Sequence, residues 1–561
     1  MGNMSPAASP LKRTTVLLLL AVFALLWFGN LDYRKLVRPD EGRYAELPRQ
    51  MAVTGDWLTP RLNGIKYFEK PPLQYWATAA AYRMFGEHEW TVRLWPALTG
   101  FVAVILTGIA TAALFGATAG LYAAAVLASS LGYMLVAHIA TLDMGFTLFM
   151  TLALAGFALG LAPGRADAVR ARWIYAAWAG MALAVLSKGL AGVVLPLFVL
   201  GLYVVLHWDW KLVARVRPVT GGLLFLAIAA PWFVLVSIAN PEFPSFFFIH
   251  EHFARFLTKV HRRAAPWWFF VPILLLGILP WVVAMAGAIR DGLRRSAEAT
   301  FHAPRFLVLW AVAIFLFFSA SSSKLPSYIL PIFPALAILI GWHLTRVGDT
   351  GLRGTLALYG AVGVILAAIA PVAERFAPNG EDLALFAAYV PWLRAAGVIM
   401  VLGAIGAWLV HRRNRTAAIL GVAFSVLVAE QSLMMGHEEL APRSSFHAMA
   451  QRVQPHLREG APFYSVGTYE QTLPFYLKRT VTLVAFADEM AYGLEQEPQL
   501  WFPDLASFQE KWRKDDYALA IMPPRIYDEL TRAALPMTVI ARNNRHVVVV
   551  RTTTGQRSNG S

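Results

Sequence analysis

The feature that most constrains this chain is a series of apolar runs, each roughly twenty residues long. A helix of that length crosses the ~30 Å hydrocarbon core of a bilayer. Hydrophobic residues make up 57% of the chain and charged residues only 15%, against about 45–50% and about 25% in soluble domains. A large soluble core would show shorter runs interrupted by polar faces. The sequence therefore predicts an α-helical protein that crosses a membrane many times.

These runs predict about thirteen transmembrane helices. They lie near residues 13–31, 92–115, 117–136, 141–161, 172–187, 189–206, 219–239, 267–288, 305–320, 328–346, 354–372, 388–410 and 416–434. The first run follows Lys12 and Arg13 and ends without a good cleavage site, so we interpret it as a retained signal anchor.

Lysine and arginine gather in alternate connections, which predicts the orientation of the chain. The connections that we place inside contain Lys12, Arg13, Arg165, Arg170, Arg172, Lys211, Arg215, Arg217, Arg290, Arg294, Arg295, Arg305, Arg346, Arg353, Arg412, Arg413 and Arg415. The short outer connections hold at most one basic residue each. We therefore expect the N-terminus inside and, with an odd number of spans, the C-terminus outside.

Two long outer loops, 32–91 and 240–266, are rich in Arg, Lys, His, Trp and Tyr, against the bias just described. Binding of anionic groups at the membrane surface is the simplest cause. These loops complete a predicted transmembrane catalytic domain over residues 1–434.

Short β-type runs separated by helical patterns predict a soluble α/β domain over 435–561, in which we find no catalytic motif. The chain has no cysteine, which excludes disulfides, thiolate chemistry and cysteine-ligated zinc.

The first outer loop contains the most prominent candidate carboxylate, Asp40. Pro39 suits a first helical position, so Asp40 falls in the first turn of a helix and shares one face with Arg43 and Tyr44. Asp40 is a candidate catalytic group, but aspartate also commonly caps helices. Local sequence does not separate the two roles.

Further along this loop, tandem prolines hold Glu69 and Lys70 extended. Taken alone, this pair fits a surface helix with a chance ion pair at least as well as it fits a site.

Asp143 and Lys188 each lie at the outer mouth of a predicted span, where ionisable groups are costly and usually functional. The alternative for both is a side chain that extends to the membrane interface.

The second outer loop offers ligands for a metal and for phosphate. His250 and Glu251 could join Glu69 around a divalent ion such as zinc or manganese, although an interfacial aromatic helix explains the segment better. Arg255 is suited to bidentate phosphate binding. Lys324 adds another outer cation.

Five short motifs occur in an order that resembles one family, the bacterial aminoarabinose transferases that modify lipid A. The motifs are Arg38 to Tyr44, Thr54 to Pro60, Tyr67 to Pro72, Glu251 to Phe256 and Lys324 to Tyr328. Each is weak alone, but the ordered set is specific, and it covers the chain from the first span onward. These enzymes are related to the protein O-mannosyltransferases within the GT-C class of glycosyltransferases. The resemblance implies a GT-C fold in the bacterial inner membrane, with the active site and the C-terminal domain facing the periplasm.

The resemblance also implies an activity and a set of site residues. The donor would be undecaprenyl phosphate 4-amino-4-deoxy-L-arabinose and the acceptor a lipid A phosphate, giving cationic lipid A and resistance to polymyxin and other antimicrobial peptides. The catalytic acids would be Asp40 and Asp143. Substrate and phosphate would be bound by Arg43, Tyr44, Tyr67, Lys70, Lys188, Arg255, Lys324 and Tyr328. A divalent metal (Zn, Mn or Mg) would lie at Glu69 and His250, with no organic cofactor. We expect a monomer that contacts membrane lipids and no nucleic acid.

The predicted reaction is a single inverting displacement of polyprenyl phosphate, which preorganised cations would assist. A lipid A phosphate is already anionic, so Asp40 would orient the acceptor or pair with the 4-amino group, whereas a hydroxyl acceptor would need it as a base. The enzymatic alternative is a protein O-mannosyltransferase or another polyprenyl-phosphate-sugar transferase with a hydroxyl acceptor. A flippase or transporter is a more distant alternative, because the sequence shows no internal repeat and few mid-span charges.

Overall fold

The computed structural model describes residues 13–254, 265–294, 301–378 and 380–552. The chain divides into two compact units. The helical unit comprises Met1–Arg34, Glu69–Gln74 and Arg93–Glu439, and the mixed unit comprises Lys35–Phe68, Tyr75–Val92 and Leu440–Ser561.

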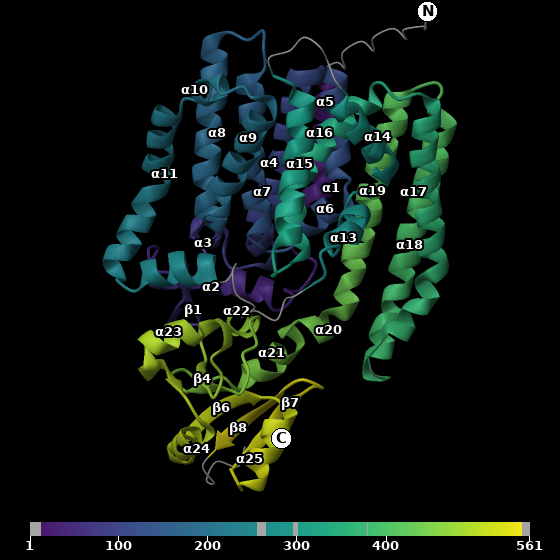
Figure 1. The fold of residues 1–561 in the computed structure, drawn as a ribbon. Helices are drawn as coiled ribbons and strands as arrows, with labels where there is room; N and C mark the ends of the chain where they lie inside the picture. Colours follow the sequence, from purple (N-terminus) through teal and green to yellow (C-terminus); the bar gives the residue numbers. More distant parts are fainter. Residues whose placement is uncertain (1–12, 255–264, 295–300, 379, 553–561) are drawn as a thin grey trace, which may run out of the picture. The chain divides into compact units, whose positions relative to one another are not determined.

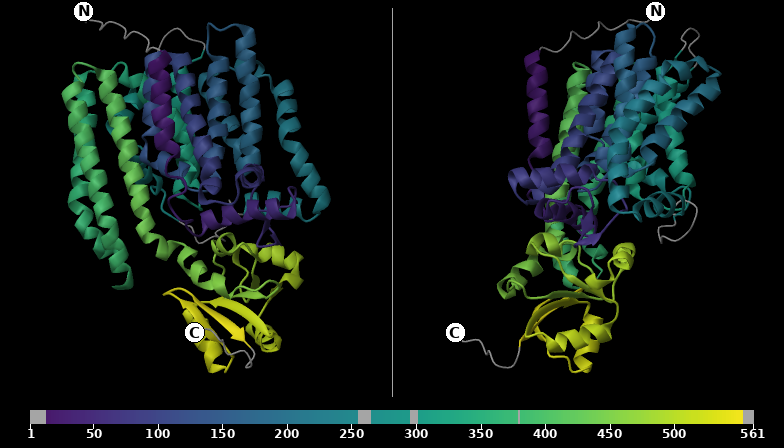
Figure 2. Two further views of the ribbon diagram at one scale, coloured as in Figure 1. Left: turned by 180° about the vertical axis from the view of Figure 1, so that it is seen from behind. Right: turned by 90° about the vertical axis from the view of Figure 1, so that its left-hand side faces the viewer.

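Long apolar helices make up the helical unit, and neighbours such as α7 and α8, or α17 and α18, run side by side (Figure 1). The helices assigned wholly or mainly to it are α1 (Arg13–Phe28), α4 (Glu89–Phe115), α5 (Ala117–Ala128), α6 (Leu131–Ala137), α7 (Asp143–Leu161), α8 (Asp167–Lys188), α9 (Ala191–His207), α10 (Lys211–Arg215), α11 (Pro218–Ala239), η1 (Ser245–Ala254), α13 (Phe270–Gly277), α14 (Val282–Leu293), α15 (Ala303–Ala320), η2 (Pro326–Ile332), α16 (Phe333–Leu344), α17 (Asp349–Ile369), η3 (Ala370–Phe376), α18 (Gly380–Val410), α19 (Arg415–Gly436) and η4 (His437–Leu440). Two further views show the same packing of long helices within this unit (Figure 2).

Every predicted span coincides with helix. Among the described residues, eight helices are long and apolar enough to cross a membrane, or ten if each of two bent pairs is one span. The bent pairs differ from the straight spans predicted over 117–136 and 267–288: α5 and α6 meet at 65°, and α13 and α14 at 107°. At the first bend the hydroxyls of Ser129 and Ser130 donate to the carbonyls of Ala125 and Val126, a contact that bends helices. At the second, Pro280 lacks the N–H that a continuous helix needs.

Buried polar side chains tie the end of α1 to its neighbours in the helical unit. The Trp27 indole donates to the carbonyl of Ala97 at 2.8 Å. Arg93 is fully buried and donates to the carbonyls of Leu31 and Arg34 at 2.9 and 2.6 Å. These bonds fix where the chain leaves the first span.

The mixed unit combines a six-stranded sheet with short helices and a two-stranded hairpin. Its helices are α2 (Asp40–Thr54), α3 (Leu73–Phe85), α20 (Ala441–Ser444), α21 (His447–Val453), η5 (Gln454–His456), α22 (Leu473–Leu477), η6 (Asp488–Met490), α23 (Ala491–Gln496), η7 (Pro498–Leu500), α24 (Leu505–Lys514) and α25 (Pro524–Arg532). Its strands are β1 (Arg61–Leu62), β2 (Ile65–Lys66), β3 (Phe463–Val466), β4 (Thr482–Val484), β5 (Trp501–Phe502), β6 (Tyr517–Met522), β7 (Thr538–Arg542) and β8 (Val547–Thr552).

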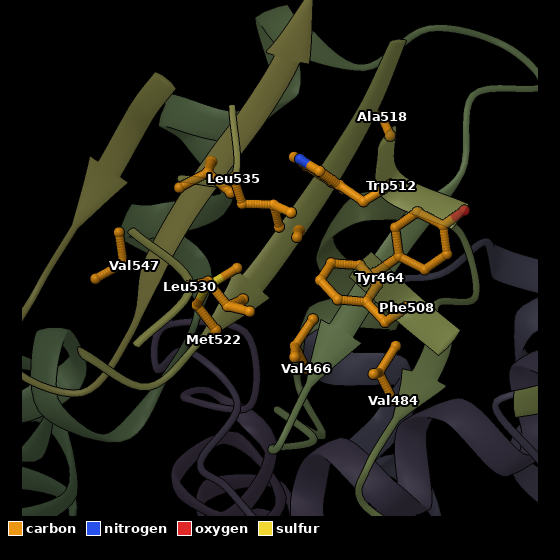
Figure 3. Packing of buried hydrophobic residues seen from close by; sticks show 12 residues of the cluster. Tyr464, Val466, Val484, Phe508, Trp512, Ala518, Met522, Leu530, Leu535 and Val547 are labelled. Atoms are coloured by element: carbon orange, nitrogen blue, oxygen red, sulfur yellow. The ribbon is translucent and has the colours of Figure 1, made fainter. Parts of the chain in front are cut away.

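The large sheet has the strand order β5-β4-β3-β6-β8-β7, in which β5, β4, β3 and β6 are parallel and β8 runs antiparallel to both of its neighbours, β6 and β7. Residues from β3, β6, β8, α24 and α25 form its core, with Tyr464, Phe508 and Trp512 packed edge to face or tilted (Figure 3). The α/β prediction for the C-terminal domain is confirmed. The short strand β5 and the edge strand β7 were not predicted.

The first outer loop folds with the C-terminal domain rather than as a separate loop. The compact unit begins at Leu440, close to the predicted boundary at 435, but it also takes in 35–68 and 75–92. Arg61 donates to the Glu497 carboxylate at 2.9 Å. Asn63, at the turn between β1 and β2, exchanges two hydrogen bonds of 2.7 and 2.8 Å with the backbone of Val481. The predicted site motif at Asp40 therefore rests on a scaffold supplied by both ends of the sequence.

Candidate functional site

Helix α2 positions the first group of candidate residues. It begins at Asp40, directly after Pro39, as the sequence predicts, and it continues for fifteen residues to Thr54. The Glu41 carboxylate accepts a hydrogen bond from the backbone N–H of Val37 at 2.9 Å. Within the described part of the chain, no backbone amide donates to Asp40. The start of α2 has no side-chain cap, and the Asp40 carboxylate is left for another role.

Arg43 holds the Asp40 carboxylate from one turn along the same helix. Its Nη1 donates to Asp40 Oδ1 at 2.8 Å, the contact expected from the i,i+3 spacing. On its other edge, Nε forms an ion pair with Glu489, which comes from η6 of the C-terminal domain. The side chains of Arg43 and Glu489 are 12% and 10% exposed, whereas that of Asp40 is 49% exposed. Arg43, which is itself paired with Glu489, therefore holds the accessible carboxylate of Asp40.

The charge of Arg43 is secured by its surroundings. Burial opposes the charged form, but Tyr67, Glu489, Tyr44 and Asp40 more than offset it, so the pKa of the guanidinium is raised above its usual value. Arg43 stays cationic at every pH at which the protein is folded. The Arg43 guanidinium lies 5.9 Å from the centre of the Tyr44 ring.

Tyr44 and Tyr67, both predicted to bind substrate, are buried beside this pair. The Tyr44 ring stacks on Tyr75 of α3 at 6.3 Å between centroids. Tyr67 is 3% exposed, and its backbone N–H donates to the carbonyl of Pro60 at 2.9 Å. The structure thus brings four predicted residues of the mixed unit together: Asp40, Arg43, Tyr44 and Tyr67.

The helix is held in the mixed unit by close packing, and a second ion pair lies within it. A Cβ on Gly42 would lie 2.5 Å from the carbonyl carbon of Gln471, so only glycine allows this approach. One turn further along, fully buried Glu46 accepts hydrogen bonds from Arg49 and Gln50 at 2.5 and 2.6 Å. The packing of Gly42 against Gln471 fixes the orientation of the turn that carries Asp40, whereas the Glu46 bonds stabilise the helix itself.

The helical unit contains a second group of predicted residues. Asp143 begins α7, Lys188 ends α8, and the two form an ion pair with side chains 13% and 18% exposed. The Lys188 ammonium also lies 4.8 Å from the centre of the Tyr328 ring, in η2. Each charge suits its helix end, because the dipole favours an anion at the N-terminus and a cation at the C-terminus. The two side chains thus pair with each other, and neither simply extends to the membrane interface.

Lys324 lies in the segment just before η2 and is 6% exposed. Its ammonium donates to the backbone carbonyl of Ser321. A buried ammonium with a neutral acceptor keeps its charge available to an anion. The helical unit therefore presents a set of predicted residues with two cations and one carboxylate: Asp143, Lys188, Lys324 and Tyr328.

The predicted metal site is only partly described. Glu69 and Lys70 are half-buried, and the Lys70 ammonium donates to the Glu69 carbonyl at 2.8 Å. His250 belongs to a π-helix, but its side chain lies outside the described residues, as does Arg255 entirely. Among the described side chains, no group of three or more His, Cys, Asp or Glu is placed to hold a metal ion. A metal at Glu69 and His250 stays a prediction.

Glu489 is the site residue that sequence analysis missed. It belongs to a domain without a recognisable motif, and nothing in its local sequence indicates a partner far upstream. The neighbouring Asn63-Gly64 pair did carry a signal, because Asn-Gly is the preferred dipeptide of a two-residue hairpin turn. Both residues have positive φ, 53° and 82°, as such a turn requires. This signal predicts the hairpin alone, and the contact of Asn63 with Val481 of the C-terminal domain follows only from the structure.

Comparison with known proteins extends these observations. Residues 449–551 match the aminoarabinose transferase C-terminal domain, and residues 13–289 match the dolichyl-phosphate-mannose-protein mannosyltransferase family. An undecaprenyl phosphate-alpha-4-amino-4-deoxy-L-arabinose arabinosyl transferase of Edwardsiella ictaluri is 32% identical over 504 residues, which are 87% of this chain and 88% of the relative. The chain belongs to the aminoarabinose transferase family. A second family member, from Proteus mirabilis, is 30% identical over 97% of this chain and 95% of its own length.

Solved structures agree with this assignment. ArnT from Cupriavidus metallidurans, bound to undecaprenyl phosphate, is 37% identical and superposes with a TM-score of 0.92 over 98% of this chain and 99% of its own. The oligosaccharyltransferase AglB from Archaeoglobus fulgidus shares the fold at 14% identity, with a TM-score of 0.51 over 91% of this chain and 70% of its own. The predicted GT-C fold is therefore confirmed. As an aminoarabinose transferase family member, the chain is a multi-pass membrane glycosyltransferase that depends on a polyprenyl phosphate.

Proposed function

We propose that this protein transfers 4-amino-4-deoxy-L-arabinose from undecaprenyl phosphate to a phosphate group of lipid A. The observation that carries the proposal is the 37% identity to ArnT over 98% of the chain, in a structure that binds undecaprenyl phosphate. The enzyme acts in the bacterial inner membrane, with residues 32–91 and the C-terminal domain on the periplasmic side. The asymmetry of Lys and Arg between alternate connections supports that orientation. The product is a cationic lipid A that resists polymyxin.

In the proposed reaction an oxygen of the lipid A phosphate attacks the anomeric carbon of the sugar. The bond from that carbon to undecaprenyl phosphate breaks, and the electron pair leaves with the phosphate oxygen. Charge on the leaving phosphate grows during this step, so fixed cations stabilise the transition state more than the ground state. We assign this role to Lys188 and Lys324, each of which is held by the protein before substrate binds. Tyr328, against the Lys188 ammonium, limits the positions that this cation can take.

Asp40 acts on the sugar rather than on a proton in this proposal. The attacking phosphate oxygen is already anionic near neutral pH, so no general base is needed. The Asp40 carboxylate is about half exposed and is fixed on one side by Arg43. It can therefore pair with the 4-ammonium group of the sugar and with the positive charge that develops at the anomeric carbon. Arg43 and Glu489 orient it.

The proposal is tested with purified protein and the undecaprenyl-linked aminoarabinose donor. Lipid A and a Ser/Thr-rich peptide are offered in parallel, and products are identified by mass spectrometry. Transfer to lipid A alone supports the proposal. Transfer to the peptide would instead identify a hydroxyl acceptor and would require Asp40 to act as a base. A near wild-type rate for Asp40→Asn would remove Asp40 from the mechanism under either acceptor.

A further inference from the structure

The helical unit has an open cavity of about 970 Å³ that none of the candidate site residues lines. It lies where α4, α14 and α16 end and where α15 and α17 begin. Among the described residues, its lining contains a single carboxylate, Asp291, and five arginines: Arg165, Arg290, Arg294, Arg305 and Arg346. The sequence places all five arginines in connections predicted to face inward.

The one carboxylate already has two neighbours as partners. His343 Nδ1 lies 2.7 Å from one oxygen of Asp291, and Arg294 lies 3.5 Å from the other. Arg290 and Arg346 are exposed and have no carboxylate partner within the described part of the chain. The cavity is therefore strongly cationic.

Three arginines of this cavity are held in place, which prepares it for a phosphate rather than for loose counterions. The Arg346 guanidinium lies over the Trp342 indole, 4.5 Å from the ring centre, and Trp342 in turn stacks on Phe115. A stacked guanidinium keeps its N–H groups directed outward in one plane, which suits a phosphate. Arg165 and Arg305 donate to backbone carbonyls at 2.6 and 3.4 Å, which anchors their side chains.

The general bias of inner loops toward basic residues does not explain this arrangement. Arg172, Arg412 and Arg413 satisfy that bias as exposed side chains that do not line the cavity. Basic pockets between transmembrane helices bind lipid headgroups. Beside the cavity, Leu293 is 58% exposed and offers apolar surface for an acyl chain. We propose that the cavity binds the phosphate of an anionic membrane lipid, separately from the sites of sugar transfer.

The test measures lipid binding to the full-length protein in detergent by native mass spectrometry. Phosphatidylglycerol is the probe, with phosphatidylcholine and inorganic phosphate as separate arms. We expect wild type to bind one phosphatidylglycerol more tightly than any phosphatidylcholine, and millimolar inorganic phosphate not to displace it. The triple variant Arg290→Gln, Arg294→Gln, Arg346→Gln should bind that lipid at least about tenfold more weakly, since each basic group near a lipid headgroup contributes to affinity.

The matched control is Arg172→Gln, Arg412→Gln, Arg413→Gln, which removes the same charge from the same set of connections. It should keep wild-type lipid affinity. Equal weakening in both triples would overturn the proposal, because it would point to diffuse attraction. Displacement by inorganic phosphate, or equal binding of phosphatidylcholine, would also overturn it. If the cavity triple variant has a lower melting temperature than wild type in the absence of lipid, phosphatidylglycerol binding is measured on Arg290→Gln alone. Wild-type affinity in that single variant would count against the site.

Discussion

Replacing Glu489 by glutamine tests whether the C-terminal domain orients the Asp40 carboxylate. Glutamine keeps the size of the side chain but removes the negative charge that pairs with Arg43 Nε. Both partners are about a tenth exposed, so the lost attraction between the charges is larger than the ~0–1 kcal/mol of a surface ion pair. Asp40 still balances part of the Arg43 charge. We therefore expect the activation free energy of sugar transfer to rise by ~1–2 kcal/mol, which corresponds to a fall in kcat of about tenfold.

The assay is the initial rate of sugar transfer by purified protein, with the melting temperature measured on the same sample. Glu497→Gln is the matched control, since Glu497 forms a similar ion pair with Arg61, 2.9 Å away in the same unit. We expect the two variants to melt alike and only Glu489→Gln to lose activity. Equal loss of activity in both would mean that Glu489 matters only for the stability of the unit. A wild-type rate in Glu489→Gln would refute the positioning role.

Three further predictions address the second ion pair, the packing of α2 and the response to acid. Asp143→Asn or Lys188→Met alone should lower stability by ~1–3 kcal/mol, because each leaves one charge unpaired, and the double variant should melt above the Lys188 single variant. Gly42→Ala should cost ~1–3 kcal/mol and lower activity, because its new methyl group meets a backbone carbonyl at 2.5 Å. Burial and the charge of Arg38 lower the pKa of His546 to about 4. The pKa of an unfolded histidine is ~6.5, so the contribution of His546 to the free energy of unfolding should be complete above that pH. It should be lost as the pH falls from about 6.5 to 4, and His546→Asn should reduce this loss.

Controls and contrary outcomes differ for each. Strictly additive losses in the double variant would show that Asp143 and Lys188 do not interact. Gly421→Ala, in α19 with open space around it, should not destabilise the protein, and a loss equal to that of Gly42→Ala would argue against the steric explanation. Parallel pH profiles for wild type and His546→Asn, measured as melting temperatures, would contradict the assigned cause of acid sensitivity.

Local features of the site followed from the sequence. The contact between Asp40 and Arg43 is set by helical spacing, and Pro39 indicates where that helix begins. In each case the interaction depends on residues within one turn or one apolar face, so a single segment carries the information.

Contacts between distant segments could not be derived in this way. Asp143 and Lys188 were both placed at outer helix ends, but helical spacing does not relate two different helices. Glu489 reaches Arg43 only because the C-terminal domain folds together with the first loop. The bends at 129–130 and near Pro280 depend on hydroxyl contacts and on neighbouring helices, which hydropathy does not report.

The most direct test of the central claim is mass spectrometry of lipid A from cells with and without this gene. The account predicts a mass increase of one aminopentose for each modified phosphate, seen only when the gene is present and lost in Asp40→Asn. Unmodified lipid A in cells that produce the protein and its undecaprenyl-linked donor would contradict the proposed function.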